Sequence, residues 1–86
     1  MERQEILERL KEILITTRTI NQSKVPGITE ETDFIADLNT PSTEMINIAA
    51  KAEQKFKVEF DDDDIDGLGS KVKDFVDLII KAKARA

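Results

Sequence analysis

The stretch that decides the fold lies at residues 33–42, which read Asp33-Phe34-Ile35-Ala36-Asp37-Leu38-Asn39-Thr40-Pro41-Ser42. An amphipathic segment follows from 43 to 56, so residue 42 stands where a loop enters a helix. Pro41 suits the first helical position, with Thr40 as the N-cap before it. The Ser42 hydroxyl is then expected to be exposed, beside unpaired backbone N–H groups that favour a phosphate. Alternatively, Ser42 is an ordinary helix-capping serine.

Apolar residues on both sides of this stretch recur at spacings of three and four, which predicts amphipathic helices. One helix is expected over residues 2–18 and a second over 41–57, with Val58 and Phe60 buried after it. A short turn over 62–68 is stopped by Gly67 and Gly69, and Ser70 then caps a last helix. The long connection over 21–41 is expected to be pinned across the core by its apolar residues, Val25, Ile28, Phe34, Ile35 and Leu38.

These elements predict an all-α fold, a small four-helix bundle with three long helices, one short third helix and a long first loop. The 86 residues suffice for a single domain, residues 1–86. The chain contains no Cys, His or Tyr. Disulfides, cysteine metal sites and the usual general base are therefore excluded, and a self-contained enzyme is not expected.

Charge is unevenly distributed over the chain, whose net charge is −5. Residues 61–70 carry five acids and no base, which favours partners with basic surfaces. The sequence lacks a basic face with interleaved aromatic residues, the pattern that would indicate nucleic acid as a partner. The basic residues Lys81, Lys83 and Arg85 are interpreted as complementing the dipole of the last helix. No secretory signal and no run of roughly 18–20 apolar residues is present, so we expect a cytoplasmic monomer without a membrane span.

An acidic run at residues 62–67 resembles the start of a calcium-binding loop. Asp62, Asp64 and Asp66 occupy the first three ligand positions, and Gly67 follows them. The position that requires a bidentate Glu is Lys73, however. We therefore expect no metal site, although a divalent-cation-binding helical protein using these three acids stays as a minor alternative.

The apolar stripe of the second helix supports two interpretations. Its larger residues are expected to be core, whereas its alanines leave room between helices that is either tight packing or an expandable cavity for an acyl chain. The candidates for lining such a cavity are Met45, Ile48, Ala49, Ala52 and Leu68.

Taken together, residues 33–42 resemble the acyl carrier protein family, whose members typically read Phe-x-x-Asp-Leu-Gly-x-Asp-Ser-Leu across this point. Phe34, Asp37, Leu38 and Ser42 fall in register with that pattern. The resemblance extends over essentially the whole chain, through the order of helices, the long first loop and Phe56 fourteen residues after Ser42. This order and spacing favours the carrier interpretation over a capping serine.

The resemblance implies that a phosphopantetheinyl transferase attaches 4′-phosphopantetheine from coenzyme A to Ser42. The chain would then be a non-catalytic carrier of acyl thioesters for fatty-acid, lipid or polyketide-type biosynthesis, serving enzymes with basic docking surfaces. The residues that the resemblance assigns to docking are Thr43, Glu44, Ile46, Asn47 and Glu53.

Several positions depart from the family pattern. Pro41 and Thr43 replace the Asp and Leu that flank the serine. Lys51 and Lys55 add positive charge to a helix that is usually acidic. These departures indicate a specialised rather than a housekeeping member, and an unmodified carrier-like interaction module is the alternative function.

Overall fold

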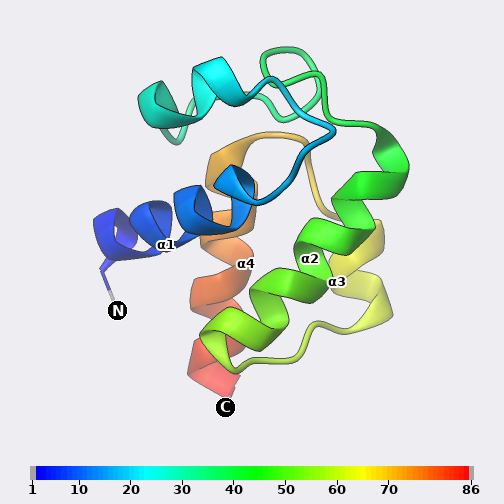
Figure 1. Cartoon of the computed structure of the whole chain (residues 1–86). Helices are drawn as coiled ribbons and strands as arrows, with labels where there is room; N and C mark the ends of the chain where they lie inside the picture. The colour runs from blue at the N-terminus through cyan, green and yellow to red at the C-terminus, as the bar shows by residue number, and fades with distance from the viewer. Residues whose placement is uncertain (1, 86) are drawn as a thin grey trace.

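The computed structural model describes residues 2–85 and confirms the expected all-α fold (Figure 1). The elements in chain order are α1 (Arg3–Ile15), the 3-10 helix η1 (Gln22–Gly27), α2 (Ser42–Phe56), α3 (Asp62–Asp66) and α4 (Val72–Arg85). The long helices α1, α2 and α4 cross one another, the connection that carries η1 arches over one end of the bundle, and α3 is the short element. The helix η1 was not predicted, because a segment this short shows no helical periodicity.

The core lies between the three long helices and is built from their apolar stripes. Three phenylalanines on three different segments, Phe34, Phe56 and Phe75, are its largest fully buried side chains. The connection over 21–41 is pinned to this core as expected, since Val25, Ile28, Phe34 and Leu38 are all buried. Ile35 is the exception, because 49% of it is exposed.

The first helix ends at Ile15, earlier than the predicted residue 18. Two threonine hydroxyls terminate it, because Thr16 Oγ1 and Thr17 Oγ1 donate to the Ile13 carbonyl at 2.7 and 3.1 Å. The side-chain amide of Gln22 donates to the Leu14 carbonyl at 2.8 Å. Side chains therefore donate hydrogen bonds to carbonyls of the last turn, which would have accepted backbone N–H groups if the helix had continued.

Two predicted helix caps are wrong. Pro41 rather than Thr40 occupies the N-cap position of α2, because the Pro41 carbonyl accepts the N–H groups of Glu44 and Met45 at 2.9 and 3.3 Å. Thr40 is instead buried, and its hydroxyl has no hydrogen-bond partner among residues 2–85. Before α4, Ser70 does not cap the helix, and the Lys71 N–H donates to the Asp74 carboxylate at 3.1 Å instead.

Candidate functional site

Ser42 is the first residue of α2, and it is exposed. Pro41 before it is extended, with φ −61° and ψ 145°, so the chain turns sharply into the helix. Pro41, the N-cap residue, makes no side-chain capping hydrogen bond to this end of α2. The Ser42 hydroxyl thus lies at the positive end of a fifteen-residue helix whose first N–H groups are not taken by a capping side chain.

One tight turn over 33–39 delivers the chain to this position. Asp33 Oδ1 accepts the N–H groups of Ile35 and Ala36 at 2.8 and 2.9 Å, which starts the turn. Asn39 ends it in the left-handed conformation, with φ 56°, and donates its N–H to the Ile35 carbonyl at 3.1 Å. Asn tolerates this conformation better than most residues. Asp37 is part of the same turn, because its Oδ2 accepts the Asp33 N–H at 2.8 Å.

The turn is fastened to the segment just before α4. Ser70 Oγ donates to Asp33 Oδ2 at 2.8 Å, and the Phe34 N–H donates to the Ser70 carbonyl at 2.8 Å. Asp33 and Lys71 form an isolated antiparallel bridge. The hydrogen bond from the Ala36 N–H, followed by that from Ser70, lowers the pKa of the Asp33 carboxyl. Asp33 therefore accepts these bonds as an anion at neutral pH.

Apolar side chains anchor the same turn, residues 33–39, in the core. Phe34 is fully buried and its ring meets that of Phe75 edge-on, with the ring centroids 4.9 Å apart. Leu38 is also fully buried. The turn that precedes Ser42 is therefore anchored in the core by Phe34 and Leu38.

A hollow of about 220 Å³ opens beside Ser42, between α2, α3 and the loop before α4. Three of the five predicted pocket residues line it, namely Met45, Ala49 and Leu68. Ile48 and Ala52 do not line it, and both are fully buried in the core. Sequence reasoning missed Ile35 and Ile65 as lining residues, since their place depends on how the loop and α3 fold back over α2. The full lining is Ile35, Ser42, Met45, Ile46, Ala49, Ile65, Leu68, Gly69 and Ser70.

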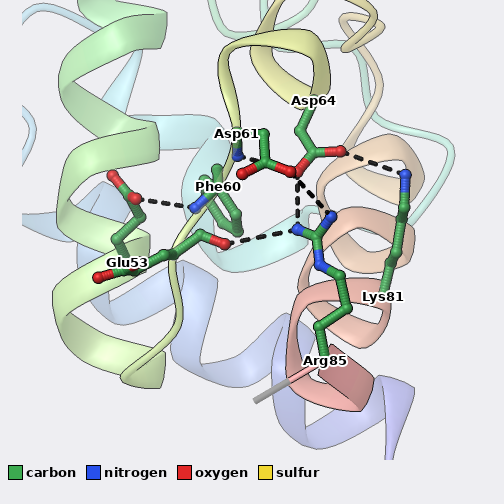
Figure 2. Close-up of polar contacts among 7 residues, drawn as sticks. Glu53, Phe60, Asp61, Asp64, Lys81 and Arg85 are labelled. Carbon is green, nitrogen blue, oxygen red and sulfur yellow. Dashed lines mark hydrogen bonds and ion pairs between the residues drawn. The ribbon is translucent and has the colours of Figure 1, made fainter.

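The predicted docking residues lie in two different settings. Thr43, Ile46 and Asn47 are exposed near Ser42, and 64% of Ile46 is exposed. The carboxylate of Glu44 accepts the side-chain amide of Asn47 at 3.2 Å. Glu53 lies near the other end of α2, where its carboxylate accepts the Phe60 N–H at 2.9 Å (Figure 2). Glu53 thus has a structural contact, and docking stays a prediction for all five residues.

The acidic run does not gather into a cation cage. Among residues 2–85, no three carboxylates lie together as metal ligands would. Asp64, the middle member of Asp62, Asp64 and Asp66, instead pairs with Lys81 and Arg85 of α4 at 3.2 and 2.7 Å. The interpretation of these two basic residues as mere dipole partners was therefore incomplete. Within the same residues, every helix is too short or too polar to cross a membrane.

Fold and site together define a small helical protein that presents a serine at a helix start beside an apolar hollow. No protein-family model matches the chain. It is 39% identical over 79 residues to an acyl carrier protein of Coprothermobacter proteolyticus, with 92% of each chain covered. It is also 34% identical over 77 residues to one from Zymomonas mobilis, covering 90% of this chain and 94% of the relative. An acyl carrier protein of Tropheryma whipplei is 33% identical over 84 residues, with 98% of both chains covered. The chain belongs to the acyl carrier protein family.

Proposed function

We propose that this protein carries acyl groups on a 4′-phosphopantetheine arm attached to Ser42. The observation that carries the proposal is the exposed hydroxyl at the uncapped start of α2, in a chain related over nine-tenths of its length to acyl carrier proteins. The arm supplies a thiol that holds acyl groups as thioesters, and the chain itself has no cysteine.

The residues around Ser42 fit such a group. A phosphate on Ser42 would lie at the start of α2, where the helix dipole favours a negative charge. Met45, Ala49 and Leu68 offer apolar surface in the adjoining hollow for the start of an acyl chain. In the attachment step, Ser42 Oγ forms a bond to the phosphorus nearest pantetheine in coenzyme A. The bond from that phosphorus to the bridging oxygen breaks, and the adenosine bisphosphate leaves while the serine proton passes to a base of the transferase.

The partners of this function are a phosphopantetheinyl transferase and the enzymes that load and use acyl groups in fatty-acid, lipid or polyketide-type biosynthesis. The exposed residues nearest the arm, Thr43, Ile46 and Asn47, are the first surface that a partner bound at Ser42 would meet. Farther along α2, Lys55 is paired with Glu12 of α1 at 3.0 Å. A monomeric carrier in the cytoplasm suits this role.

Intact-mass spectrometry tests the attachment. After incubation with coenzyme A and a transferase, the full chain should gain the mass of one phosphopantetheinyl group. Ser42→Ala should gain nothing, whereas Ser23→Ala, which removes another exposed serine, should be modified like the wild type. Absence of added mass with several unrelated transferases and with host extract would refute the proposal, leaving the unmodified interaction module.

A further inference from the structure

The short helix α3 forms a wall of the hollow beside Ser42 without a fully buried apolar side chain of its own. None of its five residues is fully buried. Its Ile65 and the following Leu68 are half-buried, pack against the core cluster and line the hollow. Apolar burial therefore contributes less to the position of α3 than to that of the three long helices.

Polar contacts with the last turns of α4 hold α3 in place (Figure 2). Asp64 Oδ2 accepts Arg85 Nη2 at 2.7 Å and the Asp61 N–H at 3.0 Å, and Asp64 Oδ1 accepts Lys81 Nζ at 3.2 Å. Arg85 also reaches Asp61 Oδ2 at 3.3 Å and the Glu59 carbonyl at 3.5 Å. We name the Asp64 carboxylate with Lys81 and Arg85 the latch.

The latch differs from an ordinary surface ion pair in one respect. The Asp64 side chain is only 5% exposed, although its partners Arg85 and Lys81 are 40% and 64% exposed. Its two oxygens accept three hydrogen bonds, two of them from cations, and charge-assisted bonds of this kind are the stronger ones. The hydrogen bond from Arg85, first among several causes, holds the pKa of the Asp64 carboxyl well below its usual range.

We propose that the latch keeps α3 closed over the hollow beside Ser42, and that releasing it makes room for a longer acyl chain. Ile65 directly follows Asp64, so a displacement of Asp64 from α4 carries the lining residue with it. The part of this inference that concerns acyl chains rests on the proposed function. The part that concerns the closure of α3 does not.

Hydrogen exchange on the unmodified full chain tests the closure. In Arg85→Gln at low salt, backbone amides of residues 62–68 should exchange roughly five- to tenfold faster than in the wild type, as expected for the loss of a charge-assisted contact. Amides of α1 and α2 should be unchanged. Added salt should speed exchange over 62–68 in the wild type more than in Arg85→Gln, because ions screen the latch.

Two variants serve as matched controls. Lys83→Gln removes a charge from the same helix, at a residue that forms no ion pair within residues 2–85. Arg9→Gln breaks an arginine–carboxylate ion pair that lies wholly within α1, the contact of Arg9 with Glu5 at 3.1 Å. Neither should change exchange over 62–68. Equal exchange there in the wild type and Arg85→Gln would overturn the latch, whether or not Ser42 is modified.

A second experiment tests the effect on cargo. On protein loaded with a dodecanoyl chain, alkaline hydrolysis of the thioester should be severalfold slower in Arg85→Gln than in the wild type. The wider hollow should bury more of the acyl chain and protect its thioester from hydroxide. With a hexanoyl chain the two rates should agree. Equal dodecanoyl rates would overturn the role of the latch in accommodating cargo. A failure to load Ser42 at all would instead count against the proposed function and leave the exchange result standing.

Discussion

Replacing Phe34 with alanine should destabilise the protein severely, because this side chain joins the turn before Ser42 to the core. Phe34 is fully buried against Phe75. Truncation of a buried Phe to Ala typically costs about 3–5 kcal/mol in free energy of unfolding, from lost burial and the cavity left behind. At roughly 0.05–0.15 kcal/mol per residue, the total free energy of unfolding of an 86-residue chain is only about 4–13 kcal/mol. We expect a loss of about 4 kcal/mol, a large share of the whole.

A gentler change separates packing from aromatic geometry. Phe34→Leu preserves most of the side-chain volume but loses the edge-on contact with Phe75. We therefore expect it to lower the free energy of unfolding by about 1–2 kcal/mol. A double-mutant cycle that combines Phe34→Leu with Phe75→Leu should give a coupling free energy between the two rings of about 0.5–1.5 kcal/mol. Urea denaturation followed by far-ultraviolet circular dichroism measures all of these free energies.

The half-buried Phe60 provides the control, since Phe60→Ala should cost clearly less than Phe34→Ala. A loss at Phe34 of less than about 1.5 kcal/mol would refute the reasoning, because it would mean that the ring is not a core anchor.

Three further predictions concern charge, close packing and pH. Replacing Asn47 and Lys51 with Glu should speed modification by a housekeeping transferase, with a gain that shrinks as salt rises; equal rates at low salt would argue against a charge-based partner choice. In Gly69→Ala the new Cβ would overlap the Asp74 carboxylate, so thermal unfolding should report a loss of about 0.5–1.5 kcal/mol that vanishes in an Asp74→Ala background. The pKa of Asp64 is lowered by folding, so its contribution to stability is complete above its ordinary pKa near 4 and declines as pH falls below that value. The difference in melting temperature between wild type and Asp64→Asn should therefore be constant from pH 7 to pH 5 and narrow toward pH 3, and a difference that widened in acid would contradict this sign.

The three long helices were predictable because their apolar residues repeat locally, and the burial of Ile6, Leu10 and Ile48 follows that repeat. The start of α2 at Ser42 was predictable within one residue for the same reason. Local patterns failed where a partner is distant in the chain. Ser70 was predicted as a helix cap, but its hydroxyl meets Asp33, which is 37 positions away.

The same limit applies to the latch and to the hollow. Arg85 and Asp64 are 21 positions apart, and only the fold shows that the basic end of α4 lies against α3. Ala49 and Ala52 lie three residues apart on α2 and are both buried in the core, yet only Ala49 also lines the hollow.

The fastening of the 33–39 turn to residues 70–72 has a consequence for the order of events during synthesis. The turn that presents Ser42 needs the carbonyl and hydroxyl of Ser70, and the Val72 N–H must reach the Thr32 carbonyl at 2.8 Å. Phe75, the partner of Phe34, emerges from the ribosome later still. A nascent chain that already exposes the serine therefore lacks the geometry around it until the first turn of α4, as far as Phe75, has emerged. An enzyme that recognises this folded turn, and not merely the local sequence, will pass over nascent chains that end before Phe75.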